Sequence, residues 1–256
     1  MNISIKTEEQ IKIMREGGRK LASIMQELEK NIRPGENTLE LDKLAEKLVF
    51  DSGGRPAFKG FGGEGKKAYP ATICASINAE VVHGIPAANK ILKNGDIFKI
   101  DIGMEYQGFF LDMARSFLIG NADEKARKLL EVAEESFWQG IKYLKAGRNL
   151  SDYSKAVQKY VEKNGFSVVR NLVGHGIGKK LHEDPQIPNY YNKKYVDLKL
   201  EAGVTLALEP MINAGNFETV LDKDGWTYKT QDGLWSSHYE NTILITKDGT
   251  EVLTKI

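Results

Sequence analysis

The stretch that decides the fold runs from Asp96 to Gly120 and reads DIFKIDIGMEYQGFFLDMARSFLIG. Its apolar and β-branched residues predict two strands folded into a hairpin, in which Gly108 supplies the positive φ of a tight turn. With the turn centred on the Tyr106–Gln107 bond, Asp101 and Asp112 face each other with Cβ atoms about 5 Å apart. Two carboxylates at so short a distance in a buried sheet need a shared proton or a cation between them. The hairpin therefore favours a cation site, whereas a register shifted by one residue would turn one aspartate to solvent.

The composition and charge of the chain limit its function. The 256 residues include 36 basic and 35 acidic side chains, and a net charge of +1 gives no electrostatic case for binding nucleic acid or an anionic membrane. The opening MNISIKTEEQ lacks the apolar core of a signal peptide, and no apolar run reaches the roughly 18 residues of a membrane span. Cys74 is the single cysteine, which excludes an intrachain disulfide and a cysteine-ligated zinc site. We expect a cytoplasmic protein in which any metal is held by His, Asp and Glu.

Apolar periodicity and breaker residues predict further helices and strands around the hairpin. Thr7 and Gln10 have the form of a capping box, and Thr38 and Ser151 are the expected N-caps of two later helices. The glycine-rich segment Lys59 to Ala68 does not match a phosphate loop and is interpreted as a mobile surface loop; the alternative is a loop that covers a site. We predict helices over residues 7–30, 38–51, 122–145 and 151–163, and strands over 71–78, 166–173, 204–213 and 238–246.

The same order of features occurs twice along the chain. Gly35-Glu36-Asn37 recurs as Gly147-Arg148-Asn149, Val82-His83-Gly84-Ile85 resembles Gly174-His175-Gly176-Ile177, and Asp101 after Gly95 matches Glu209 after Gly203. One explanation is chance among common residues. The other is a duplicated half-domain, roughly 1–120 and 121–256, about a pseudo-twofold axis. On that interpretation Asp112 corresponds to Glu240, and four carboxylates converge at the seam, where hard divalent cations would bind.

Three of the four histidines, His83, His175 and His182, lie on or beside glycine-rich turns, where functional residues are common. The His182-Glu183 pair does not begin an HExxH zinc motif, because Gln186 stands where the second histidine belongs and Pro185 blocks a helix. There is no G-x-S-x-G nucleophile elbow, so a serine hydrolase has no support.

Separated motifs surround the acidic residues and histidines in a fixed order. They are SINAEVVHGIP around His83, DIFKIDIG and FFLDMARSF around Asp101 and Asp112, VGHGIGKKLHEDPQIPNY around His175 and His182, LALEPMINAG around Glu209 and HYENTILIT around Glu240. Together these motifs resemble those of the type I methionine aminopeptidases, a family with the "pita-bread" fold. The resemblance covers the chain from the first helix to Leu253, and it implies an α+β fold of two pseudo-twofold-related halves, with an antiparallel sheet covered by helices, in a single catalytic domain over residues 1–256.

The resemblance also implies a dinuclear metal site that hydrolyses peptides. In the family's chemistry the ions generate a hydroxide that attacks the first peptide bond, and Glu209 carries a proton to the leaving nitrogen. His182 is expected to contact the substrate amide or its oxyanion, and His83 the leaving side. Co, Mn, Fe and Zn all fit the donor set. The implied ligands of the two ions are Asp101, Asp112, His175, Glu209 and Glu240, with Asp112 and Glu240 bridging.

The implied substrate is the initiator methionine of a nascent polypeptide whose second residue is small. Its pocket should be apolar and suited to an unbranched thioether. The implied setting is a cytoplasmic monomer, with the ribosome as a further candidate contact. Motif matching nominates Phe61, Tyr69, Cys74, Leu181, Met211 and Trp226 for the pocket.

Two alternatives stay open at the level of sequence. An X-Pro aminopeptidase or prolidase shares the fold, although such enzymes usually carry an additional N-terminal domain. A non-catalytic binding module on the same scaffold would have lost ligands, whereas all five are present here.

Three features depart from the family pattern. The loop Gly62 to Ala68 is longer than the usual link, which affects the placement of Phe61. His238 stands two residues before Glu240, where the family tends to carry Gln, and period-2 geometry puts both on one strand face. We predict that His238 lies near the metals or lines the cleft; the alternative is an exposed histidine at a strand edge. Asn241 replaces a common His, with no role assigned.

Overall fold

The computed structural model describes residues 3–62, 68–121, 123–195 and 197–256, so most of the predicted loop Gly62 to Ala68 lies outside the described residues. Within this part of the chain, four α-helices lie close to their predicted positions. They are α1 (Glu8–Glu29), α2 (Thr38–Asp51), α3 (Glu124–Ile141) and α4 (Ser151–Lys163). None of these described helices has the length and apolar character that a bilayer crossing needs.

The helix N-termini test the predicted caps. The capping box at α1 is confirmed, because Gln10 N–H donates to Thr7 Oγ1 and Gln10 Oε1 accepts from Thr7 N–H. The N-cap of α2 is Asn37 instead of Thr38: the Asn37 side chain accepts from Glu40 N–H, while the Thr38 hydroxyl bonds to Ala87. Likewise, Ser151 is not a cap but the first residue of α4, and its hydroxyl donates to Asp197.

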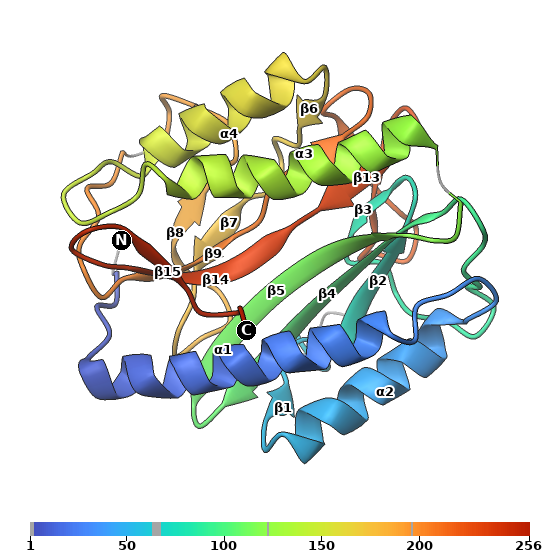
Figure 1. Ribbon diagram of the computed structural model, residues 1–256, viewed down its shortest axis with the longest axis horizontal. Coiled ribbons are helices and arrows are strands. Elements are labelled where there is room, and N and C mark those ends of the chain that lie inside the picture. The colour runs from blue at the N-terminus through green and yellow to red at the C-terminus, as the bar shows by residue number, and fades with distance from the viewer. Residues whose placement is uncertain (1–2, 63–67, 122, 196) are drawn as a thin grey trace.

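A large antiparallel sheet forms the centre of the molecule (Figure 1). Its order is β1-β4-β5-β14-β9-β7-β8, with β2 added to β4 and β15 to β14. The strands are β1 (Arg55–Pro56), β2 (Ile73–Ile77), β4 (Ile97–Tyr106), β5 (Phe109–Leu118), β7 (Gly174–Gly176), β8 (Glu183–Ile187), β9 (Thr205–Leu208), β14 (Glu240–Ile245) and β15 (Thr250–Val252).

Two three-stranded sheets complete the described fold. The first pairs β13 (Ser236–His238) with β10 (Met211–Asn213) and β6 (Ser167–Val168); the second pairs β11 (Thr219–Leu221) with β12 (Tyr228–Thr230) and β3 (Glu80–Val82). The strand predicted over 204–213 is therefore split into β9 and β10 at Glu209-Pro210, because proline has no N–H to donate to a ladder. The strand predicted over 238–246 is similarly split at Tyr239.

The predicted hairpin forms, but its register differs by two residues from the expected one. Tyr106 pairs with Phe109, and Asp101 therefore lies opposite Ala114 instead of Asp112. The turn residues Gln107 and Gly108 both have positive φ, 48° and 80°, as a two-residue turn that matches the strand twist requires. Since side chains alternate with period 2, a shift of two keeps both aspartates on the same face of the sheet. They are diagonal neighbours there.

The sheet order is mirrored about its centre. Strands β5 and β14 lie in the middle, with β4 outside the first and β9 outside the second. Helices α1 and α2 cover the half of the sheet with β2, β4 and β5, and α3 and α4 cover the other half (Figure 1). Each helix pair closes its own apolar core against the sheet. This arrangement confirms the α+β fold, and the two halves meet where the acidic residues lie.

Candidate metal centre and substrate cleft

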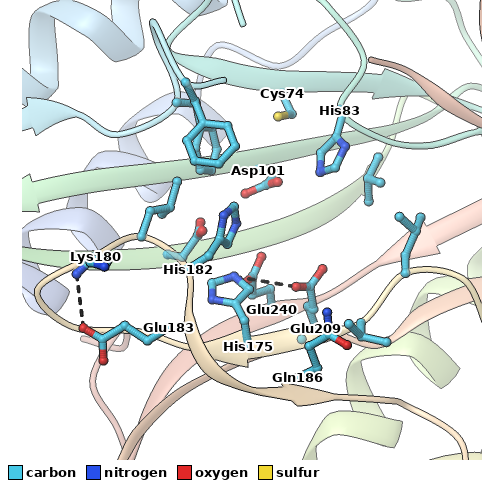
Figure 2. A pocket seen from close by; sticks show the side chains of 18 of the residues that line it. Cys74, His83, Asp101, His175, Lys180, His182, Glu183, Gln186, Glu209 and Glu240 are labelled. Atoms are coloured by element: carbon cyan, nitrogen blue, oxygen red, sulfur yellow. Dashed lines mark hydrogen bonds and ion pairs between the residues drawn. The ribbon is translucent and has the colours of Figure 1, made fainter. Parts of the chain in front are cut away.

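The four acidic residues predicted from the sequence converge at the middle of the sheet. Asp101 lies on β4 and Asp112 on β5, Glu209 directly follows β9, and Glu240 begins β14. In Figure 2 the side chains of Asp101, Glu209 and Glu240 point toward a common space that His175 also borders. These strands are neighbours in the order β4-β5-β14-β9, and this order brings residues together that are more than a hundred positions apart in sequence.

A side-chain clamp holds Asp112 against β14. Asp112 N–H donates to Thr242 Oγ1 at 2.9 Å, and the same hydroxyl donates to Asp112 C=O at 2.9 Å. The backbone ladder between β5 and β14 pairs Met113 with Asn241 and Ala114 with Glu240. The Thr242 hydroxyl therefore extends the pairing of β5 with β14 by one more position. The backbone N–H of Thr242 donates instead to Thr254 Oγ1.

Buried polar residues fix the backbone of the two glutamates. Asn189 Nδ2 donates to Glu209 C=O at 2.9 Å, and Asn189 is itself held by the Tyr153 hydroxyl. Arg115 donates to Glu240 C=O at 2.6 Å. A second Arg115 nitrogen donates to the side-chain oxygen of Asn241, which also accepts from Thr254. Asn241 thus has a definite role: it orients the arginine that positions Glu240.

A backbone hydrogen bond orients the His175 ring and leaves one ring nitrogen available as a metal ligand. Its Nδ1 lies 2.8 Å from Gly176 C=O and donates to it, which leaves Nε2 as the acceptor, 3.8 Å from Glu209 Oε1. A backbone carbonyl on the far ring nitrogen is the usual support of a metal-binding histidine. Burial lowers the pKa of His175 to about 3, so the imidazole is neutral, as ligation requires.

The four carboxylates beside His175 lie so close together that their negative charges favour the binding of cations. Burial, and next the charge of Glu209, raise the pKa of Asp101 to about 8. Burial likewise raises the pKa values of Asp112, Glu209 and Glu240 well above the usual range. One oxygen each of Asp101, Asp112 and Glu240 is buried and finds no hydrogen-bond partner in the described part of the chain. Buried carboxylates with oxygens left unpaired are the donor set of a metal centre, so the residues present fit divalent cations.

Among the described residues, two groups of ligand atoms are compact enough to hold an ion. The first consists of Asp112, His175 and Glu240, and the second of Asp101, His238 and Glu240; within each group the ligand atoms lie within 4.8 Å of one another. Glu240 belongs to both groups, as a bridging ligand would. His238, predicted to lie near the metals, is 3.5 Å from Glu209 and 3.6 Å from Glu240 through Nε2.

The acidic group forms one wall of a cleft of about 820 Å³. His83 and His182 line the same cleft, so the structure brings both predicted substrate histidines to the site. His83 has a φ of 58°, a conformation that a non-glycine residue adopts only when its surroundings enforce it. Burial lowers the pKa of His83 to about 4 and also lowers that of His182. The side chain of Glu183 bonds to Lys6 and to the backbone of Lys180, which fixes the turn that carries His182.

The six residues nominated for the methionine pocket all line the cleft. Tyr69, Cys74 and Leu181 belong to one buried apolar cluster against which Trp226 packs, and Phe61 stacks edge-on against His182. Met211 lies in a different cluster, with Val81 and Val82. Phe58, which was not nominated from the sequence, belongs to the cluster of Tyr69, Cys74 and Leu181 and also lines the cleft.

The fold and the buried carboxylate–imidazole centre define a metal-dependent peptidase: the chain belongs to metallopeptidase family M24, whose profile matches residues 12–247. Several curated relatives that are 40–46% identical to the chain are named methionine aminopeptidases. The chain is 46% identical to the methionine aminopeptidase of Clostridium perfringens over 99% of both chains. Its structure superposes on the crystal structure of methionine aminopeptidase from Thermotoga maritima with a TM-score of 0.95 and 42% identity, covering 100% of both chains.

A more distant likeness concerns the alternative considered above. The prolidase from Pyrococcus furiosus matches with a TM-score of 0.79 at 23% identity, and this chain covers 65% of it. That likeness shows a common fold and carries no argument about substrate.

Proposed function

We propose that the protein is a metallo-aminopeptidase that removes the N-terminal methionine from polypeptides whose second residue is small. The observation that carries the proposal is the convergence of three buried carboxylates, the half-buried Glu209 and His175 on one wall of a cleft that is also lined by an apolar cluster. Relatives named methionine aminopeptidase, aligned over nearly the whole chain, support the same activity.

The metal centre is proposed to hold two divalent ions. Asp101, Asp112, His175 and Glu240, which fall in the two compact groups, would be ligands together with Glu209, which lies in neither group but 3.8 Å from His175 Nε2. Glu240 is common to both groups, and Asp112 is proposed as the second shared ligand. Such ions act as Lewis acids that lower the pKa of a water molecule and polarise a peptide carbonyl. Cobalt, manganese, iron and zinc all suit a set of carboxylates and one imidazole.

The residues of the chain supply binding and proton transfer. Glu209 faces the cleft and is proposed to take a proton from the attacking water and to return it to the leaving nitrogen. His182 is proposed to hydrogen-bond the substrate amide or its oxyanion, because its ring lies 4.4 Å from that of His175, centroid to centroid. His83, which lines the same cleft together with Val82, is proposed to contact the leaving side.

The side chain of the first residue is proposed to enter the apolar part of the cleft. Tyr69 and Trp226 meet edge-to-face at 5.3 Å, and Cys74 and Leu181 pack in the same cluster. Aromatic rings and a thiol suit a flexible thioether, since sulfur makes favourable contacts at ring edges. Phe61 and Phe58 extend this wall, and Met211 is proposed to border the leaving side with Val82.

Comparison of two tripeptides tests the proposal. The metal-loaded protein should hydrolyse Met-Ala-Ser and leave Ala-Pro-Ala intact, and a chelator should stop the reaction. Preferential cleavage of Ala-Pro-Ala would identify an X-Pro peptidase, and cleavage that a chelator does not affect would rule out the metal mechanism.

The proposed setting follows from the substrate. A first methionine is present on chains as they leave the ribosome, so we propose a cytoplasmic monomer that acts on nascent polypeptides. Gel filtration tests the monomer, and co-sedimentation with ribosomes tests whether the protein contacts them.

A further inference from the structure

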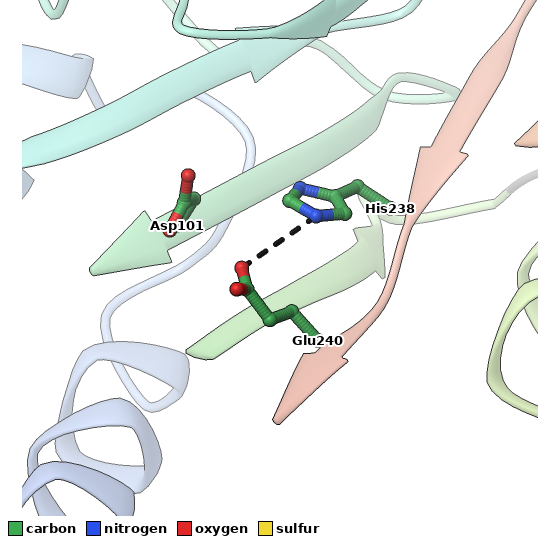
Figure 3. A group of neighbouring side chains, drawn as sticks. All are labelled: Asp101, His238 and Glu240. Carbon is green, nitrogen blue, oxygen red and sulfur yellow. Dashed lines mark ion pairs between the residues drawn. The ribbon is translucent and has the colours of Figure 1, made fainter. Parts of the chain in front are cut away.

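His238 provides the basis for an inference that deepens the proposed metal centre and rests on it. The residue is 1% exposed, and its Nε2 is buried without a hydrogen-bond partner among the described residues. Figure 3 shows the ring directed toward Glu240, with Asp101 beside it. It is not among the residues that line the cleft, so it approaches the carboxylates from within the protein instead of from the substrate side.

The distances around Nε2 fit ligands that share an ion better than they fit hydrogen bonds. Nε2 lies 3.5 Å from Glu209 Oε2 and 3.6 Å from Glu240 Oε2. Hydrogen bonds of this kind are about 2.7–3.2 Å long. Two ligands that are each about 2.1 Å from one ion, at angles of about 90–120°, lie about 3.0–3.6 Å from each other. Asp101 completes the group within 4.8 Å.

The backbone holds His238 in this position. His238 N–H donates to Ser116 Oγ at 3.0 Å, and His238 C=O lies 2.8 Å from the same hydroxyl and accepts from it. The buried Lys99 donates to Ser236 C=O at 2.9 Å at the start of the same strand. The backbone that carries the imidazole is therefore fixed in advance, and the side chain is buried, which limits the ordering cost of ligation.

We propose that His238 is an additional protein ligand of the metal centre, through Nε2, on the side of Asp101 and Glu240. This nitrogen changes the chemistry of that side, which would otherwise offer only carboxylate oxygens. Carboxylate sites suit Mn and Mg, whereas imidazole favours Zn, Fe, Ni and Cu. The predicted consequence is a stronger preference for zinc over manganese at this position than a glutamine there would give.

Two metal-binding measurements on the full chain test this. X-ray absorption at the zinc edge, on protein loaded with two equivalents of Zn²⁺, counts imidazoles per zinc: His175 and His238 together give an average of about one, and His175 alone gives about one half. Calorimetric titration of metal-free protein with Zn²⁺ and with Mn²⁺ should show zinc affinity at least about 10-fold weaker in His238→Gln, with a smaller loss for manganese. His83→Gln is the matched control, because it removes a cleft imidazole that lies outside both ligand groups.

The outcomes separate this inference from the proposed function. An average near one half in the unaltered protein, which requires no variant to fold, overturns the role of His238. An unchanged zinc-to-manganese preference in folded His238→Gln overturns it too, because glutamine can keep a hydrogen bond but offers no imidazole. In both cases metal-dependent cleavage of Met-Ala-Ser still supports the proposed function. If the unaltered protein binds neither ion and does not cleave, the proposed function fails and this inference fails with it.

Discussion

Replacing Thr242 by valine removes a hydroxyl and keeps the shape of the side chain. In the structure that hydroxyl accepts from Asp112 N–H and donates to Asp112 C=O, both at 2.9 Å, and both residues are buried. The substitution leaves two buried backbone groups without a partner, at about 1–3 kcal/mol each. We expect Thr242→Val to lower the free energy of unfolding of the metal-free protein by about 2–6 kcal/mol, measured by urea denaturation.

The same change should weaken metal binding, because Asp112 is proposed to bridge the ions. Loss of a group that orients a ligand typically costs about 10–100-fold in affinity, which calorimetry with Mn²⁺ would show.

Thr246→Val is the matched control for this substitution. The Thr246 hydroxyl makes the same pair of bonds to Gly249, but in a half-exposed turn at the far end of β14. It should cost less stability and leave metal affinity unchanged. A Thr242→Val protein with unaltered stability and unaltered affinity would refute the proposed clamp.

Three further predictions follow from the site. Glu209→Gln should lower kcat for Met-Ala-Ser by at least about 100-fold, since it removes the proposed proton carrier; steady-state rates within a few-fold of the unaltered protein would contradict that role. Leu181→Ala should widen the apolar pocket and lower kcat/KM for Met-Ala-Ser by about 10-fold or more, and equal losses on an Ala-Ala-Ser substrate would show that the pocket does not select methionine. Burial raises the pKa of Asp101 to about 8, so the folded metal-free protein binds a proton that the unfolded chain releases above about pH 4. Between about pH 6.5 and 8 the buried histidines are neutral in both states, so the denaturation midpoint should fall as pH rises through this range, and saturating Mn²⁺ should flatten this dependence; a metal-free midpoint that rises between pH 6.5 and 8 would contradict the charge argument.

Local sequence signals predicted the elements well where the relevant interactions are local. The capping box of α1 depends on Thr7 and Gln10, three residues apart, and both its bonds are present. The hairpin was placed correctly, and its acidic residues share a face as expected. The strand register of the hairpin was not predicted correctly. The turn has a positive φ at Gln107, and a glutamine in a sequence does not indicate that conformation.

The supporting residues of the site could not be found from the sequence, because their partners lie far away along the chain. Thr242 bonds to Asp112 across 130 positions, and Arg115 to Glu240 across 125. Neither pairing leaves a periodic pattern, since it depends on β5 lying beside β14. His238 was different: its position two residues before Glu240 already placed both side chains on one face, and the structure shows them 3.6 Å apart.

The proposed metal centre requires that divalent cations hold carboxylates from both halves of the sheet together. Anomalous diffraction from crystals grown with Mn²⁺ would show whether they do. We expect two anomalous peaks between Asp101, Asp112, Glu209 and Glu240, with Asp112 and Glu240 in contact with both. Crystals that hold Mn²⁺ elsewhere, or that show no peak among these four carboxylates, would contradict the proposed metal centre.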